Sequence, residues 1–194
     1  FVKNGGTLIT TFMSGIVDQS DNVHLGGYPG PLREMAGVWV EEIDALAPEH
    51  SNTVSFSDGK EYKCNLLCDL MHPEGAEVLA TYESDFYAAV TKNSYGKGHV
   101  YYVATQLEAA GLARVLDEAT NEVSVSGVIA EKTSLEITCR ESENTRFYFV
   151  MNFTDEKHAL PASLAGMVDL ITGKAAKEGD VMNKWDVKIL QEAL

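Results

Sequence analysis

Three carboxylates follow a tryptophan closely in the sequence, and acid–base chemistry is the first function that they could serve. Glu41, Glu42 and Asp44 lie within five residues of Trp39. Hydrolysis of a glycosidic bond with retention needs two carboxyl groups about 5 Å apart. The alternation of apolar and polar residues predicts a strand here, and neighbouring residues of a strand point to opposite faces. We therefore interpret these carboxylates as solvated or interface charges.

Two further patterns resemble catalytic or ligand-binding motifs. Asn121 and Glu122 copy the pair that carries the acid in many retaining glycosidases, but they follow a predicted helix and have no barrel strand before them. The Tyr95-Gly-Lys-Gly98 sequence lacks the spacing of a phosphate-binding loop and leads into a strand, which is typical of a hairpin turn. We expect no catalytic residue in this chain.

Cys64, Cys68 and His72 are the nearest approach to a metal cluster. Their spacing of four residues would place them on one face of a helix. A structural zinc site needs four ligands, and no fourth ligand lies nearby. The leucines between them indicate core, so we predict buried free thiols, no metal site and no cofactor.

Tyr28, Arg33 and Trp39 are our candidates for contact with a substrate or another subunit. Aromatic and arginine side chains serve both kinds of contact. Tyr28 lies in a segment, residues 13–31, that is rich in glycine and proline and predicts a long loop. The alternative is that Trp39 is a core residue and Tyr28 packs the loop against its own domain.

The elements expected around these residues divide the chain into two domains. Residues 1–122 have the pattern of an α/β domain, whereas residues 123–194 have the pattern of a small all-β antiparallel domain. The first domain has expected helices at 32–36 and 107–119 and expected strands at 7–12, 38–46, 53–57, 77–82, 88–94 and 99–104. The second has expected strands at 123–128, 135–140, 146–152, 159–160, 167–170 and 187–190. Residues 66–71 receive no assignment.

Composition excludes several classes of partner. A net charge of −14 disfavours nucleic acid and anionic membranes, because both require clustered Lys and Arg. No apolar run is long enough for a membrane-spanning helix. Three cysteines cannot all pair within one chain, and their scarcity favours a reducing, cytoplasmic compartment.

Five segments, taken in order, resemble the bacterial β-galactosidases of glycoside hydrolase family 42. They are Phe1-Val-Lys-Asn-Gly-Gly-Thr-Leu-Ile-Thr-Thr11, Gly26-Gly-Tyr-Pro-Gly-Pro-Leu-Arg33, Glu74-Gly-Ala-Glu-Val-Leu-Ala-Thr-Tyr82, Tyr95-Gly-Lys-Gly-His-Val-Tyr-Tyr-Val-Ala104 and Phe149-Val-Met-Asn-Phe-Thr154. The first four resemble the trimerisation domain, and the last resembles the C-terminal β-domain.

This resemblance implies a parent enzyme that hydrolyses terminal β-D-galactosides with retention and assembles as a homotrimer. It implies a partial flavodoxin-like or amidotransferase-like α/β fold for residues 1–122. The galactoside would be bound only by a catalytic barrel outside this chain, because such a barrel needs about 250 residues. We therefore expect a fragment, inactive alone, that serves oligomerisation and scaffolding.

Two other functions remain open from the sequence. An independent enzyme or binding domain of the amidotransferase-like type would need a nucleophile elbow, and the residues around Cys64 do not form one. A carbohydrate-binding module at residues 123–194 would have to use some of five aromatic residues, about half of which strand alternation would bury: Phe147, Tyr148, Phe149, Phe153 and Trp185.

Overall fold

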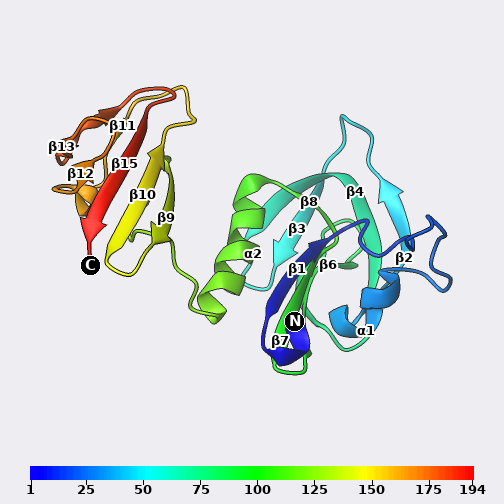
Figure 1. The fold of residues 1–194 in the computed structure, drawn as a ribbon. Coiled ribbons are helices and arrows are strands. Elements are labelled where there is room, and N and C mark those ends of the chain that lie inside the picture. Colours follow the sequence, from blue (N-terminus) through cyan, green and yellow to red (C-terminus); the bar gives the residue numbers. More distant parts are fainter. The chain divides into compact units, whose positions relative to one another are not determined.

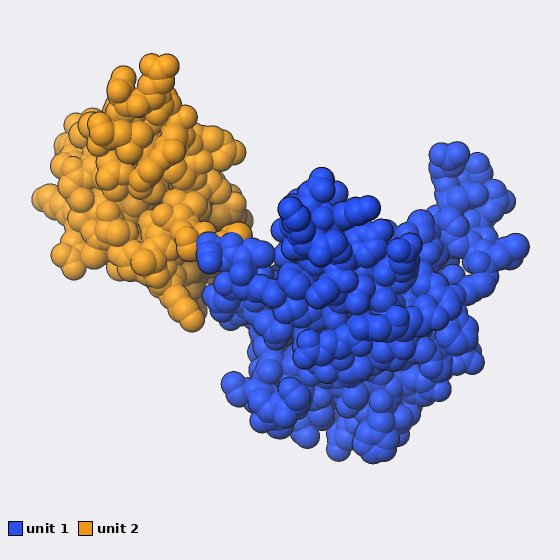
Figure 2. Space-filling view, turned by 90° about the horizontal axis from the view of Figure 1, so that it is seen from below, with its two compact units in different colours: residues 1–124 blue, residues 125–194 orange.

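The computed structural model describes residues 1–194, and the chain forms two compact units (Figure 1). The first unit comprises Phe1–Ser124 and the second Val125–Leu194 (Figure 2). Both units consist mostly of β-strands, and each has its own buried apolar cluster. No helix in the structure combines the length and apolar character that crossing a membrane would require.

The first unit is built on one eight-stranded sheet. The strands follow the order β1-β7-β6-β5-β3-β4-β2, and β8 pairs with β4. A further pairing of β4 with β6 joins β6, β5, β3 and β4 into a closed ring. The elements are η1 (Val2–Asn4), β1 (Thr7–Thr11), η2 (Gly30–Leu32), α1 (Arg33–Ala36), β2 (Val38–Ala45), β3 (Asn52–Phe56), β4 (Glu61–Pro73), β5 (Glu77–Tyr82), β6 (Ala88–Tyr95), β7 (Gly98–Val103), β8 (Thr105–Leu107) and α2 (Ala109–Glu122).

The flavodoxin-like or amidotransferase-like description of this unit is not confirmed. Only β1 and β7 pair in parallel, and every other pair in the sheet is antiparallel. A parallel pair needs a crossover connection of a dozen or more residues, whereas antiparallel strands are joined by tight turns. Turns such as those at Gly59 and Gly96 therefore favour the antiparallel arrangement that dominates here.

A glycine ends α1 directly before β2 begins. Gly37 has a φ of 64° and ends α1, with its N–H donating to the Arg33 carbonyl at 2.8 Å. This left-handed conformation is easily adopted by glycine. The chain then enters β2, as the sequence predicts.

The long strand β4 contains the segment that the sequence left unassigned. Leu66 has a φ of 71°, and the register against β8 shifts between Asn65 and Cys68. This bulge interrupts the two-residue alternation, because Leu66 is exposed although it lies midway between the buried Cys64 and Cys68. The helical arrangement considered for these cysteines and His72 is wrong, because all three lie on β4.

Helix α2 packs one face against the sheet of the first unit. Its buried residues Gly111, Val115 and Ala119 recur every four residues, and the last two belong to a cluster with Phe56 and Leu107. A side chain at Gly111 would press on Tyr62, so the close approach of the helix to the sheet requires a small residue there.

The second unit is an antiparallel β-structure, as predicted. A five-stranded sheet has the order β13-β12-β15-β10-β9, and β11 pairs with β14. The elements are β9 (Glu136–Glu141), β10 (Thr145–Met151), β11 (His158–Ala159), η3 (Ala162–Leu164), β12 (Val168–Asp169), β13 (Lys174–Ala175), β14 (Val181–Met182) and β15 (Val187–Ala193). The strand predicted at 123–128 does not form, because no neighbouring strand pairs with this segment, and Val125 and Val128 are exposed.

Candidate interaction site

The loop between β1 and η2 presents aliphatic side chains to solvent. Leu25 is 99% exposed, and Met13, Val17 and Val23 are also exposed. Asp18 orders part of this loop by accepting hydrogen bonds from the backbone N–H groups of Ser20 (2.7 Å) and Asn22 (3.0 Å). These bonds lower the pKa of the Asp18 carboxyl, the bond from Ser20 most. Exposed aliphatic residues on an ordered loop are typical of a contact surface.

Arg33, the first residue of α1, ties the end of this loop to the sheet. Its Nε donates to Glu74 Oε2 at 2.6 Å, its Nη2 bonds the other carboxylate oxygen, and its Nη1 donates to the Gly26 carbonyl at 3.0 Å. The hydrogen bond raises the pKa of Arg33 and lowers that of Glu74. The bidentate geometry orients the guanidinium, although a partly exposed pair adds little to stability.

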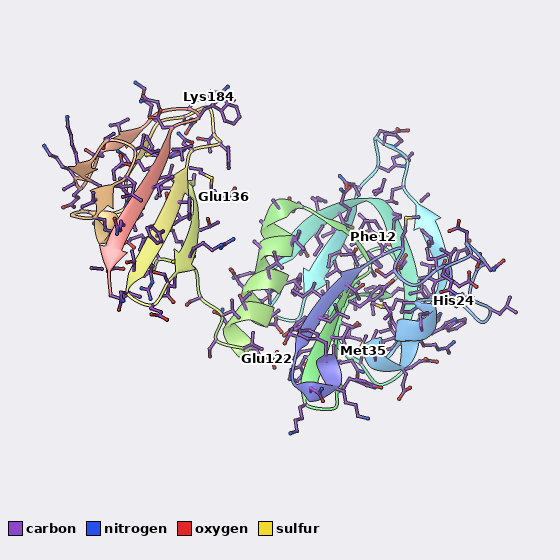
Figure 3. The ribbon with its side chains drawn as sticks, in the orientation of Figure 1. Phe12, His24, Met35, Glu122, Glu136 and Lys184 are labelled. Carbon is purple, nitrogen blue, oxygen red and sulfur yellow. The ribbon has the colours of Figure 1, made fainter.

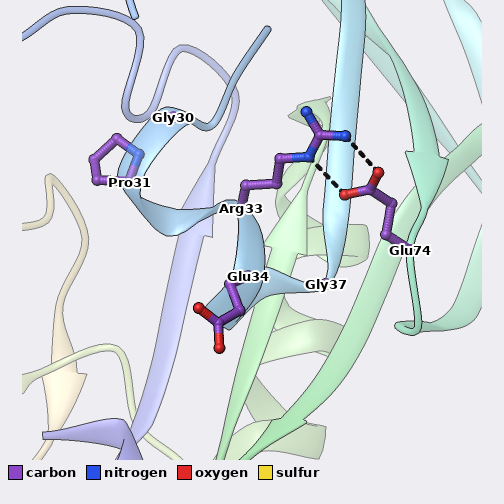
Figure 4. Close-up of a pocket in the computed structure, with 6 residues that line it drawn as sticks. All are labelled: Gly30, Pro31, Arg33, Glu34, Gly37 and Glu74. Atoms are coloured by element: carbon purple, nitrogen blue, oxygen red, sulfur yellow. Dashed lines mark hydrogen bonds and ion pairs between the residues drawn. The ribbon is translucent and has the colours of Figure 1, made fainter. Parts of the chain in front are cut away.

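A shallow pocket lies beside this ion pair (Figure 4). Its volume of about 510 Å³ falls within the range of small-molecule sites. Its lining is mostly backbone and charged groups rather than the apolar wall usual for a ligand site, which favours a contact with another protein surface. The lining residues are Gly30, Pro31, Arg33, Glu34, Gly37 and Glu74.

Four side chains contact one another in a row next to the pocket. We call Arg33, Trp39, His72 and Tyr87 the aromatic row. The Arg33 guanidinium lies 5.5 Å from the Trp39 ring centroid, and the Trp39 and His72 rings stack at 4.9 Å. Tyr87 meets His72 edge-on at 5.4 Å. His72 Nε2 lies 2.8 Å from the Glu41 carboxylate, which fixes the orientation of the imidazole ring.

Trp39 also contacts the loop backbone directly. Its Nε1 is buried without a hydrogen-bond partner in the protein. A Cβ atom at Gly27, whose φ is 88°, would collide with Nε1. The loop therefore passes directly over the edge of the indole, which only glycine allows at this position.

Tyr28 anchors the loop from the inside. Its carbonyl accepts a hydrogen bond from the Val40 N–H at 2.7 Å, and its half-buried side chain packs against the cluster that contains Val38 and Met71. Burial raises the pKa of the Tyr28 hydroxyl, and Asp69 adds to this effect. Arg33 and Trp39 thus touch each other, whereas Tyr28 supports them. Their contact with a substrate or subunit remains a prediction.

The sequence did not identify the partners of these residues. Trp39 lies directly opposite His72 in the antiparallel register of β2 and β4. These strands are separated in the chain by β3, so no hairpin signal links them. The sequence points to Glu41 only as a carboxylate and to His72 only as a candidate metal ligand, and it gives no signal for Glu74 or Tyr87. Only the pairing of β2 with β4 would have shown that these residues meet.

The carboxylates that could serve catalysis are either bonded to neighbouring side chains or exposed to solvent. Glu122 ends α2, where Lys92 (2.8 Å) and Tyr101 (2.9 Å) bond it and His99 lies at 3.3 Å. The bond to Lys92 contributes most to lowering the Glu122 pKa. Glu42 and Asp44 are exposed on β2. No three acidic, cysteine or histidine side chains lie together where they could hold a metal ion.

Comparison with known proteins identifies both units. The model of the β-galactosidase trimerisation domain matches residues 1–126, and that of the β-galactosidase C-terminal domain matches residues 134–192. A β-galactosidase of Lactobacillus acidophilus is 45% identical over 195 residues, which cover 98% of this chain and 29% of that protein. A β-galactosidase of Clostridium perfringens is 41% identical, with 93% and 28% covered.

Solved structures agree with these relatives. The crystal structure of a β-galactosidase from Bacillus circulans sp. alkalophilus matches with a TM-score of 0.88 at 39% identity, over 100% of this chain and 30% of that one. A family 42 β-galactosidase from G. stearothermophilus matches with a TM-score of 0.86 at 34% identity, over 100% and 29%. The chain thus spans less than a third of the length of these relatives.

Proposed function

Because the chain belongs to the β-galactosidases of glycoside hydrolase family 42, whose trimerisation and C-terminal domains it comprises, we propose that it assembles the subunits of a larger β-galactosidase. The observation that carries this proposal is the match of the trimerisation domain over residues 1–126. The parent enzyme would hydrolyse terminal β-D-galactosides with retention. Its catalytic carboxylates would lie in the part of the enzyme outside this chain.

The chain alone is then expected to have no galactosidase activity. Glu41 is engaged with His72, and Glu42 and Asp44 are exposed without an acid partner. A chromogenic β-galactoside assay on the purified chain and on the full-length parent tests this expectation. Activity in the parent and none in the chain supports it. Turnover by the chain that disappears in Glu41→Gln or Glu42→Gln would contradict it.

We place the subunit contact on the loop of residues 13–31 and the adjacent aromatic row. The loop is attached to its own domain through Arg33, Gly27 and Tyr28, and yet its tip exposes Leu25 almost fully. Ordering a long loop costs conformational entropy, which burial in an interface offsets. At about 25 cal/mol per Å² of apolar surface, a leucine at the tip contributes about 1.5–3 kcal/mol when buried.

Sedimentation of the full-length parent tests the assembly. We expect a homotrimer, and we expect Leu25→Asp to weaken it by about tenfold or more, because the change would bury a charge in place of an apolar side chain. Arg33→Ala and Tyr28→Ala should weaken it less, since they act through the shape of the loop. Leu170→Asp, at an exposed leucine of the second unit, is the matched control. If Leu25→Asp and Leu170→Asp leave the same trimer, the loop is not the contact surface.

Three further features of the parent complete the proposal. The boundary between the trimerisation and C-terminal domains would fall between residues 122 and 123, where α2 ends. The parallel pairing of β1 with β7 supports an α/β layer that continues in the parent. A cytoplasmic location is supported by three free cysteines, two of them buried.

A further inference from the structure

Two aromatic rings come together at one end of the second unit. Phe153 is 53% exposed and Trp185 is 62% exposed, and their ring centroids lie 6.1 Å apart at an interplanar angle of 61°. They lie 32 positions apart in the sequence. They meet because β10 and β15 pair up to Met151 and Val187. Phe153 follows Met151 closely in the chain and Trp185 comes shortly before Val187, so both rings lie at this end of the strand pair.

The backbone holds Trp185 in an unusual conformation. Its φ is 64°, in the left-handed region that side chains with a Cβ seldom adopt. Its N–H donates to the Asn152 carbonyl at 2.8 Å, and the Asn152 N–H donates to the Asp186 carbonyl at 3.0 Å. Trp185 lies within the turn of residues 183–186, which is closed by the Asn183 N–H donating to Asp186 Oδ2 at 2.6 Å. The indole is therefore held outward by its backbone rather than by core packing.

The fully buried side chain of Asn152 fixes the loop that carries Phe153. Its Nδ2 donates to the carbonyls of Glu156 (2.7 Å) and Met182 (3.0 Å). Its Oδ1 accepts from the N–H and the hydroxyl of Thr154, at 3.0 and 2.8 Å. Both ring-bearing loops are thus set before any ligand arrives, which lowers the entropic cost of binding.

Polar groups of both signs surround the rings. Lys184 (labelled in Figure 3) has its Nζ 5.3 Å from the Trp185 ring centroid and forms an ion pair with Asp155. Asn183 Nδ2 donates to Asp186 Oδ2 at 2.9 Å. A pyranose ring has an apolar C–H face that suits an aromatic ring and hydroxyl groups that both donate and accept hydrogen bonds. One lysine beside carboxylates does not suit a phosphate group.

We propose that Phe153 and Trp185 form a binding site for the sugar ring of a galactoside. Two aromatic side chains of about 150–250 Å² each, little more than half exposed, offer on the order of 200 Å². A stable protein interface needs about 800 Å² from each partner. The exposed rings match a sugar in size, whereas the aliphatic loop of the first unit suits a protein surface. The choice of galactose rests on the proposed function; the site itself rests on the two rings and their polar surroundings.

The two tryptophans of the chain, Trp39 and Trp185, make a direct test possible. Each gives one indole N–H signal in NMR, and Trp185→Phe assigns them. Titration of the chain with methyl β-galactoside should shift the Trp185 signal saturably, with a Kd of about 1–10 mM, and leave the Trp39 signal in place. Phe153→Ala, which keeps the Trp185 signal, should weaken binding by about tenfold. Phe86→Ala, at an exposed ring of the first unit with a φ of 65°, is the matched control.

In the chain itself, three results would overturn the proposal. The first is an unshifted Trp185 signal in the folded chain, and the second is an equal shift with glycerol at the same concentration. The third is an unchanged affinity in Phe153→Ala. The same titration on the full-length parent should also shift Trp185, and an unresponsive, covered indole there counts against the site. Because these readouts are binding signals, they are independent of whether the parent hydrolyses galactosides or forms a trimer.

Discussion

In the first unit, buried polar side chains lie between strands of the sheet, whereas in the second unit they hold turns. Asp69 of β4 is fully buried and accepts one hydrogen bond, from the Tyr102 hydroxyl at 2.9 Å, while its Oδ1 has no partner in the protein. Asn152 of the second unit, equally buried, makes four side-chain hydrogen bonds. All four buried side-chain polar atoms without a protein partner belong to the first unit: Thr7 Oγ1, Trp39 Nε1, Asp69 Oδ1 and Arg114 Nε.

The difference shows that burial of a polar group has opposite consequences in the two units. A buried group whose bonds are all made rigidifies its surroundings, and its removal leaves other groups unpaired. A buried carboxyl with an incomplete set of bonds is costly when ionised. Asn152 should therefore stabilise the second unit, and Asp69 should destabilise the first at neutral pH.

The largest expected effect is that of Asn152→Ala. Loss of the four hydrogen bonds of this fully buried side chain should destabilise the second unit by about 3–5 kcal/mol. Amide hydrogen exchange of Val150 and Leu190, both in its core, measures this directly. The exposed Asn183→Ala should cost about 1 kcal/mol or less. Equal protection in the two variants would remove the distinction drawn between the units.

Asp69→Asn should produce an effect that depends on pH. Burial raises the pKa of Asp69 to about 6, and the hydrogen bond from Tyr102 opposes this rise. Because the folded state holds the proton more tightly than the unfolded state, Asp69 lowers stability as the pH rises from about 4 to about 6. The loss is on the order of 3 kcal/mol at about 1.4 kcal/mol per unit of pKa.

Urea unfolding of the first unit across this range should show the decline in the wild type and a flatter profile in Asp69→Asn. Asp44→Asn, an exposed carboxyl on the adjacent strand β2, should keep the wild-type profile. A decline of the same size in Asp69→Asn would mean that another group is responsible.

The smallest expected effect separates two adjacent glycines of the loop. Gly26 and Gly27 both have a positive φ, of 93° and 88°, so alanine is strained at either position. Only at Gly27 would the added methyl group collide with Trp39, since nothing lies near it at Gly26. Gly27→Ala should therefore cost about 1–2 kcal/mol more than Gly26→Ala and should also change the fluorescence of Trp39. Equal costs would show that the loop does not rest on the indole.

Local chemistry in the sequence was sufficient for the turns and for many of the strands. The Tyr95-Gly-Lys-Gly98 sequence predicted the turn between β6 and β7, and Gly37 predicted the end of α1. Both predictions succeeded because glycine, unlike residues with a Cβ atom, adopts a positive φ at little steric cost. The segment around Leu66 could not be assigned, since its bulge depends on pairing with β8, which lies some forty residues further along the chain.

The sequence by itself determined the family, the mostly β character of the second unit and the residues most worth examining in the loop. Only the tertiary structure decided which of them meet. Trp39 stacks on His72 through the β2–β4 register, and Phe153 reaches Trp185 through the β10–β15 register. The physical reason is that strand register is fixed by burial of whole faces against a core, a property of the assembled sheet rather than of any short segment.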